Sequence, residues 1–145
     1  LRIIWELIEF QPKSRKTDIA QALKFLSGTQ KKKAIVFVIS DFMAEDYEHT
    51  LKIAAKKHDI TGIRVYDIRE EKIPDLGMVS MLDAETGQIQ LVNTGSKSVR
   101  MNYEKQYHNK VNYFKETFSK SGSGVVNTRV DESYVTKLLS YFKSR

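Results

Sequence analysis

Polar side chains follow two apolar, β-prone runs of the sequence at the point where each run stops. Ser40 and Asp41 come directly after Ala34 to Ile39, and Asp67 comes directly after Ile63 to Tyr66. Open α/β sheets bind their ligands at the carboxyl ends of buried strands. Asp41 is therefore the first candidate for a binding residue, whereas Asp67 is better placed for a turn or for an ion pair with Arg64 or Arg69.

The residues of common catalytic machinery are missing or badly spaced. The chain has no cysteine, which excludes thiolate nucleophiles and cysteine-based zinc sites. Ser40 has no Gly-x-Ser-x-Gly elbow around it, and the sequence has no glycine-rich phosphate loop. His49, His58 and His108 are far apart, so we predict three surface histidines and no zinc site. The sequence thus favours binding over catalysis.

The elements that would position the aspartate alternate between helix and strand. Ala34 to Ile39 is continuous and apolar, which predicts a parallel strand buried on both faces. The helix before it should have Asp18 as its N-cap and stop at Gly28. The helix after it should begin at Glu45 or Asp46. Successive helix–strand units predict a parallel sheet with helices on its faces.

The second half of the sequence departs from this alternation. Met78 to Leu82 and Gln88 to Val92 are short β-prone runs joined by a loop that ends in glycine, as in a β-hairpin. An apolar stripe at helical spacing then predicts one long, core-packed helix. A third strand, Gly124 to Val130, and a last helix capped by Asp131 follow. The stripe consists of Val99, Tyr103, Tyr107, Val111, Phe114 and Phe118.

Length and composition are those of one globular domain. The 145 residues include 41% hydrophobic and 29% charged side chains and carry a formal net charge of +6, which is ordinary for a soluble protein. The longest apolar run is far shorter than the roughly 20 residues that span a bilayer, and no signal peptide is recognisable, so we expect a cytoplasmic protein. Leu1 to Phe10 reads as an amphipathic helix at the cut edge of a larger protein.

Several segments together carry a family resemblance. They are Thr17-Asp18, Val38 to Phe42, His58 to Ile60, Val65 to Glu71, Ile73 to Gly77, Asp83 to Gly87, Tyr134-Val135 and Tyr141-Phe142. On these motifs, which cover nearly the whole chain in the right order, the sequence resembles the domain-of-unknown-function 58 family. Members of that family resemble von Willebrand factor A domains and are typically encoded beside MoxR-type AAA+ ATPases.

The resemblance also implies a metal site. Domains of the A type bind a divalent cation through an Asp-x-Ser-x-Ser motif, a later threonine and an aspartate after the fourth strand. Thr17 and Asp41 match the last two positions, which implies that they hold Mg²⁺ through hard oxygen ligands in the intact protein. The first motif does not occur in the sequence. We therefore expect it to precede Leu1, expect residues 1–145 to be the C-terminal portion of a single truncated A-type domain, and expect no cofactor to bind this portion alone.

Three functions are open at this point. The resemblance implies a non-catalytic protein-binding module that acts with a MoxR-type ATPase in complex assembly or maturation. A nucleic-acid-binding module would use Lys13, Arg15, Lys16 and Lys31 to Lys33, and a metal-dependent hydrolase is the third possibility. We favour the first and predict no nucleic-acid partner, because the lysines are spread along the chain and Lys31 to Lys33 resemble a solvated helix end.

The resemblance further implies an unpaired strand. Ala34 to Ile39 corresponds to the fourth strand of an A-type sheet, whose neighbour is the first strand. Without that neighbour, the N–H and C=O groups on one side of an apolar strand are open to pairing with another chain. We therefore expect the chain to self-associate through Ala34 to Ile39, across a two-fold axis.

Overall fold

The computed structural model describes residues 2–11, 16–83 and 86–144, so two residues of the expected hairpin turn lie outside the described residues. The elements in chain order are α1 (Arg2–Glu9), α2 (Ile19–Thr29), β1 (Ile35–Ser40), α3 (Glu48–Ala55), β2 (Asp59–Tyr66), the 3₁₀ turn η1 (Ile68–Glu70), β3 (Met78–Leu82), β4 (Ile89–Asn93), α4 (Lys97–Lys120), β5 (Gly124–Arg129) and α5 (Tyr134–Lys143).

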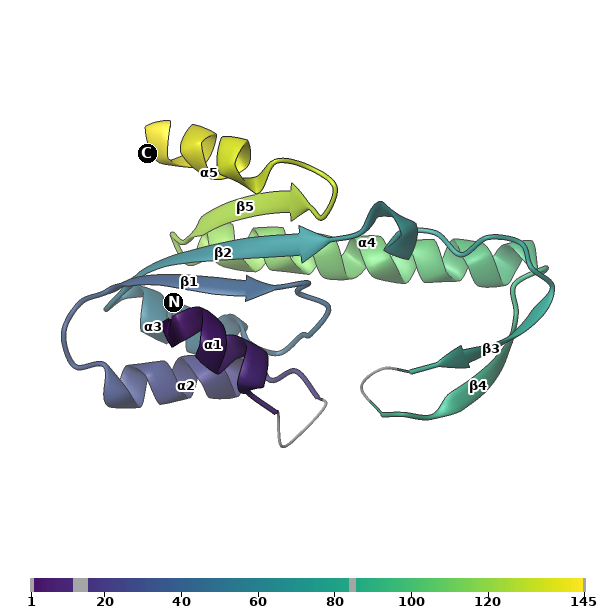
Figure 1. Ribbon diagram of the computed structural model, residues 1–145, viewed down its shortest axis with the longest axis horizontal. Helices are drawn as coiled ribbons and strands as arrows, with labels where there is room; N and C mark the ends of the chain where they lie inside the picture. The colour runs from purple at the N-terminus through teal and green to yellow at the C-terminus, as the bar shows by residue number, and fades with distance from the viewer. Residues whose placement is uncertain (1, 12–15, 84–85, 145) are drawn as a thin grey trace.

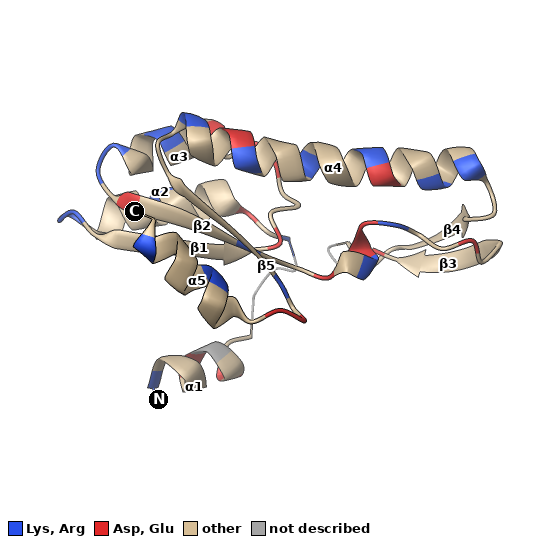
Figure 2. Cartoon of the chain, turned by 90° about the horizontal axis from the view of Figure 1, so that it is seen from above, with Lys and Arg blue, Asp and Glu red and all other residues tan. Residues whose placement is uncertain are grey.

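The three central strands form a parallel sheet in the order β1-β2-β5. β2 lies in the middle of the sheet: Ile35 of β1 is paired with Asp59 of β2, and Thr61 of β2 is paired with Gly124 of β5. Helices α2, α3 and α4 lie on one face and α5 lies on the other (Figures 1 and 2). Because the strands run in the same direction, their last residues, Ser40, Tyr66 and Arg129, all lie at the carboxyl edge of the sheet. This confirms the predicted α/β fold with a parallel sheet flanked by helices.

The core lies between the sheet and α2 to α4 and is built around aromatic rings. Phe42, Phe114 and Phe118 are fully buried, with centroids 4.0 Å apart for Phe42 and Phe114 and 4.9 Å apart for Phe114 and Phe118. Gly62 of β2 lies against two of these rings: a Cβ there would be 2.6 Å from Phe118 and 2.7 Å from Phe114. The close approach of β2 to α4 therefore requires a residue without a side chain.

The long helix α4 carries the predicted stripe, and its two ends have different surroundings. Val99 and Tyr103 are only partly buried, because this end extends past the sheet towards the β3–β4 hairpin (Figure 1). Neither α4 nor any other helix in the described part of the chain is long and apolar enough to cross a membrane. The stripe residues that are buried in the core are Tyr107, Val111, Phe114 and Phe118.

The predicted hairpin is confirmed: β3 and β4 pair antiparallel, with Met78 opposite Asn93. Its open end is held by the buried Thr94, whose N–H and hydroxyl both donate to the carbonyl of Gly77, at 2.7 and 2.8 Å. Arg100 of α4 then donates to the carbonyl of Thr94 at 2.6 Å. These bonds attach the hairpin to the start of α4.

The prediction that β1 is buried on both faces is wrong. Val36 and Val38 pack against the core, but Ile35 and Ile39 on the opposite face are each 67% exposed and Phe37 is 45% exposed. The reason is that β1 is the outermost strand of the described sheet, while α5 packs chiefly on β5. One α5 residue, Phe142, reaches Phe37 with a centroid distance of 6.0 Å.

Helix ends match the sequence signals only in part. The Asp18 carboxylate caps α2 by accepting the N–H of Gln21 at 2.7 Å, as predicted. Helix α2 nevertheless continues through Gly28 to Thr29, and α3 begins two residues after the predicted Asp46, which has a positive φ of 63° and is not helical.

The predicted cap of the last helix is also wrong. Ser133, and not Asp131, caps α5 by accepting the N–H of Thr136. The Asp131 carboxylate is instead paired with the Arg129 guanidinium at 2.7 Å. A two-residue shift of the helix start is enough to exchange the capping and ion-pairing roles of these neighbouring polar residues.

Candidate functional site

A cavity of about 830 Å³ lies at the carboxyl end of β1, and both predicted site residues line it. Asp41 directly follows β1, and Thr17 precedes α2. The two residues belong to different loops, and the fold brings these loops together at one edge of the sheet. The other lining residues are Lys16, Asp18, Ala20, Met43, Ala44, Glu45, Asp46, Asp83, Tyr103 and Lys110. We call this cavity the rim cavity.

The rim cavity is acidic although the chain as a whole is basic. Among the described residues that line it, two are lysines and five are carboxylates. Hydroxyl and carboxylate oxygens at a sheet edge are the ligands preferred by Mg²⁺. The charge and the donor types therefore suit a cation better than a phosphate group. The carboxylates are Asp18, Asp41, Glu45, Asp46 and Asp83.

The backbone after β1 is held in a tight turn that presents Asp41. The Asp41 carboxylate accepts the N–H of Met43 at 3.2 Å, and Ser40 Oγ accepts the N–H of Phe42 at 3.1 Å. Phe42 adopts a positive φ of 56°, which turns its ring into the core while the Asp41 side chain stays exposed. Asp41 therefore caps a local turn and not helix α3, which begins later, at Glu48.

A buried arginine, which the sequence suggested only as one of two ion-pair partners for Asp67, supports this turn. Arg64 of β2 is 3% exposed, and its Nε donates to the carbonyl of Asp41 at 3.2 Å. Its Nη2 donates to the hydroxyl of Tyr107 at 2.5 Å, and its guanidinium lies 4.1 Å from the centre of the Tyr66 ring. The cation is thus solvated by a carbonyl, a phenol and an aromatic face in place of water. Arg64 thus holds the backbone of Asp41 in place through the hydrogen bond to its carbonyl.

Asp67 at the end of β2 has the ion-pairing role predicted for it. Its carboxylate accepts hydrogen bonds from the N–H of Arg69 at 2.9 Å and from the guanidinium Nε of Arg69 at 3.0 and 3.1 Å. The hydrogen bonds from Arg69 lower the pKa of Asp67 to about 2. An aspartate that is already paired in this way caps the η1 turn and is a poor candidate for a metal ligand.

The histidines are distributed differently from the prediction. His49 and His108 are exposed as expected, but His58 is only 3% exposed. Neither ring nitrogen of His58 has a hydrogen-bond partner among the described residues. The prediction of three surface histidines is therefore wrong for His58, which is buried although Lys56 in the same turn is exposed.

The basic residues proposed for nucleic-acid contact do not form one described surface. Lys31, Lys32 and Lys33 are exposed in the loop before β1, whereas Lys16 lines the acidic rim cavity. Lys13 and Arg15 lie outside the described residues. Along α4, Lys and Arg outnumber Glu, and the blue segments are interrupted by red ones (Figure 2). The described residues among those proposed for nucleic-acid contact do not support the nucleic-acid alternative.

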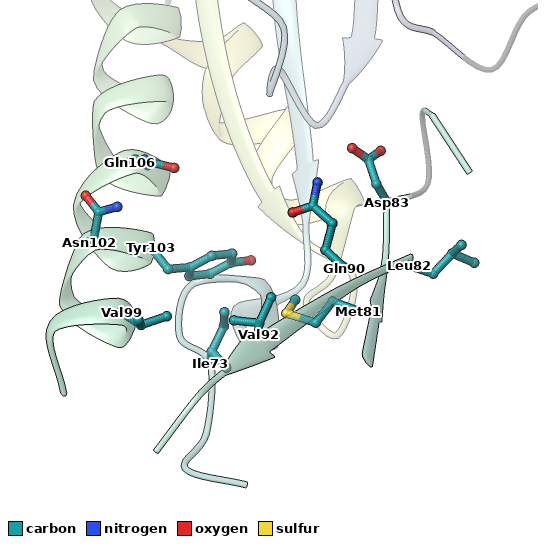
Figure 3. A pocket seen from close by; sticks show the side chains of 10 residues that line it. All are labelled: Ile73, Met81, Leu82, Asp83, Gln90, Val92, Val99, Asn102, Tyr103 and Gln106. Carbon is teal, nitrogen blue, oxygen red and sulfur yellow. The ribbon is translucent and has the colours of Figure 1, made fainter. Parts of the chain in front are cut away.

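A second cavity, of about 570 Å³, adjoins the rim cavity and shares Asp83 and Tyr103 with it. It lies between the hairpin and α4, with Val92 and Ile73 near Val99 on the apolar side (Figure 3). Its polar side chains come from both the hairpin and α4. They are Asp83, Gln90, Asn102, Tyr103 and Gln106.

The fold and the cavities define a class of protein: an α/β domain with an acidic cavity at the carboxyl edge of a parallel sheet. The family is identified by sequence. A family model described as "Protein of unknown function DUF58" matches residues 1–113. The chain belongs to this family, which confirms the resemblance drawn from its motifs.

The chain is also similar to individual mycobacterial proteins. An uncharacterised protein of Mycobacterium avium is 26% identical over 129 residues, which is 88% of this chain and 76% of that protein. An uncharacterised protein of Mycobacterium bovis is 30% identical over 79 residues, which is 54% of this chain but only 25% of that protein.

A solved structure supports the fold. The crystal structure of BatB from Bacteroides thetaiotaomicron, described as a conserved hypothetical protein, superposes with a TM-score of 0.54 at 17% identity. The match covers 99% of this chain and 66% of BatB, so the chain spans less than two thirds of that structure and about a quarter of the M. bovis relative. The likeness shows the fold alone and is consistent with a von Willebrand factor A-like architecture.

Proposed function

We propose that this chain is a non-catalytic protein-binding module whose contact point is the rim cavity. The observation that carries the proposal is that Thr17 and Asp41, which come from separate loops, line one acidic cavity at the carboxyl edge of the sheet. The exposed Asp41 carboxylate and its supporting turn form a rigid base for a contact. A binding site on a rigid scaffold holds its geometry better than one on a free loop.

Within this proposal, Mg²⁺ mediates the contact in the intact protein. Thr17 and Asp41 supply two oxygen ligands, and the Asp-x-Ser-x-Ser motif of A-type domains supplies the others. Mg²⁺ requires six oxygen ligands and keeps several of them as water. An acidic side chain of the partner replaces one such water and completes the coordination. Thr17 and Asp41 offer the oxygen ligands that such a site needs, but they are only part of it. We therefore expect residues 1–145 alone to bind Mg²⁺ weakly or not at all.

The partner that we propose is an AAA+ ATPase of the MoxR type, because such ATPases are typically encoded beside members of this family. The cavity between the hairpin and α4 adjoins the rim and offers apolar side chains for a residue next to the partner's acidic side chain. An ATPase partner uses cellular ATP, and we therefore propose a cytoplasmic location for the complex.

The proposal is tested by measuring how tightly the full-length protein binds the ATPase encoded beside it, with Mg²⁺ and with EDTA. We expect Mg²⁺-dependent binding that Asp41→Ala weakens at least tenfold, because the variant removes a charged ligand. Glu45→Gln is the matched control, since Glu45 lines the same cavity but has no place in the ligand pattern. Equal binding by wild type and Asp41→Ala, or binding unaffected by EDTA, would contradict the proposal.

We also propose that β1 pairs with β1 of a second copy when this chain is isolated. Support comes from its position at the edge of the described sheet and from the exposed side chains of Ile35, Phe37 and Ile39 on one face. Light scattering should give a concentration-dependent dimer, and Ile39→Lys should shift it towards monomer. Ile53→Lys on α3, where Ile53 is also half exposed, should not. A wild-type chain that stays monomeric at high concentration would rule out this pairing.

A further inference from the structure

A second group of ligand-type side chains lies where the segment after η1 meets α4. Glu104 and His108 are one helical turn apart on α4, and Glu71 directly follows η1. His108 Nε2 lies 3.5 Å from Glu71 Oε1 and 3.9 Å from Glu104 Oε1. One donor atom from each residue lies within 4.8 Å of the other two. Two carboxylates and an imidazole thus converge from segments that are distant in sequence.

The two segments are already held against each other at this point. Tyr103 Oη donates to the carbonyl of Glu70 at 2.9 Å, and burial raises the pKa of Tyr103, which keeps the phenol proton in place. Lys72 Nζ lies 3.2 Å from Glu104 Oε1. Glu71 and Glu104 are both partly buried. The donor atoms are therefore positioned by contacts that do not depend on any bound ion.

The spacing and the charge of the cluster suit a transition-metal ion. A tetrahedral Zn²⁺ with nitrogen and oxygen ligands at about 2.0–2.2 Å separates neighbouring donor atoms by roughly 3.4 Å, which is close to the 3.5 Å between His108 and Glu71. Two partly desolvated carboxylates also repel each other, and a cation between them removes that cost. Among the described residues, Lys72 forms an ion pair with Glu104 but not with Glu71, so it neutralises only one of the two carboxylates.

We propose that Glu71, Glu104 and His108 form a Zn²⁺ site, with the fourth position open to water. Imidazole and carboxylate together are ordinary zinc ligands, and three protein ligands leave one position for exchange. This site is separate from the rim cavity, because none of its three residues lines that cavity. Bound Zn²⁺ would clamp the segment that leads from β2 to the hairpin onto α4, and it would stabilise the folded state by an amount that rises with the logarithm of the free Zn²⁺ concentration above the Kd.

The test is a Zn²⁺ titration of the chelator-treated protein at neutral pH, followed by calorimetry. Wild type should bind one Zn²⁺, and His108→Ala and Glu71→Gln should each weaken that binding by at least about tenfold. His49→Ala removes another exposed histidine and should leave the affinity unchanged. Lys72→Met should bind Zn²⁺ more tightly than wild type, because it removes a positive charge that competes for Glu104.

The outcomes separate a zinc site from a simple His–Glu ion pair. Circular dichroism establishes first that the variants are folded. If wild type takes up no Zn²⁺, or if His108→Ala binds it as well as wild type, the proposal is wrong and the cluster is an ion pair only. The Lys72→Met result supplies an independent check, since an ion pair between His108 and Glu71 gives no reason for tighter Zn²⁺ binding.

Discussion

Replacing Phe42 by alanine should lower the free energy of unfolding by about 3–5 kcal/mol, the usual cost of removing a buried phenylalanine ring. Phe42 is fully buried, stacks on Phe114 and contacts the edge of Phe118 at a centroid distance of 5.3 Å. Its backbone is also the turn that presents Asp41. Urea denaturation followed by circular dichroism measures the loss, and the same variant should weaken any contact made at the rim cavity.

Phe25→Ala is the matched control for this loss. Phe25 lies on α2 and is 70% exposed, so its truncation should change stability by no more than about 0.5 kcal/mol. If Phe42→Ala cost less than about 1 kcal/mol, or no more than Phe25→Ala, the aromatic cluster would not be the centre of the core. Phe42 would then not anchor the turn that presents Asp41.

Gly62→Ala should be destabilising although alanine is the smallest change available. The added methyl carbon would lie 2.6 Å from a Phe118 ring carbon and 2.7 Å from a Phe114 ring carbon, well inside van der Waals contact. Both rings are fully buried, so neither can move without displacing the core. Overpacking of this kind costs about 1–3 kcal/mol. A shift of the urea midpoint at unchanged slope would report it.

The control for Gly62→Ala is the same substitution at Gly28. Gly28 lies in α2, and an added methyl carbon there would have no described atom within 4 Å beyond its own chain neighbours and helix backbone. Alanine at this position should therefore stabilise the protein by up to about 1 kcal/mol through helix propensity. Opposite signs for the two substitutions are expected. A Gly62→Ala variant as stable as wild type would show that β2 and α4 are not packed as closely as described.

Local signals in the sequence are sufficient to predict most of the elements. Asp18 is recognisable as the cap of α2 because its carboxylate needs only a neighbouring backbone N–H, three residues on. The hairpin and the stripe of α4 are predictable for the same reason, since turn residues and a 3.6-residue period are local properties. The position of Thr17 near Asp41 follows from the family resemblance and not from any local pattern.

The features that sequence reasoning missed depend on tertiary surroundings. An apolar strand such as β1 has the same sequence pattern whether helices cover both of its faces or only one, so the exposure of Ile35 and Ile39 was not predictable. The contacts of Arg64 were not predictable, because the Asp41 carbonyl and the Tyr107 ring reach it only after folding. Glu71 and His108 are likewise neighbours only after folding, so their proximity was not predictable from the sequence.

In the intact protein, we expect Thr17 and Asp41 to bind one cation at the edge of the sheet. Mn²⁺, which substitutes for Mg²⁺ at oxygen-rich sites, broadens the NMR signals of nearby amides, and it can be titrated into the ¹⁵N-labelled full-length protein. The amide signals of Thr17 and Asp41 should broaden together at the lowest Mn²⁺ concentrations and should recover on addition of excess Mg²⁺. Broadening of only one of the two, or broadening that persists unchanged in Asp41→Ala, would contradict a shared site.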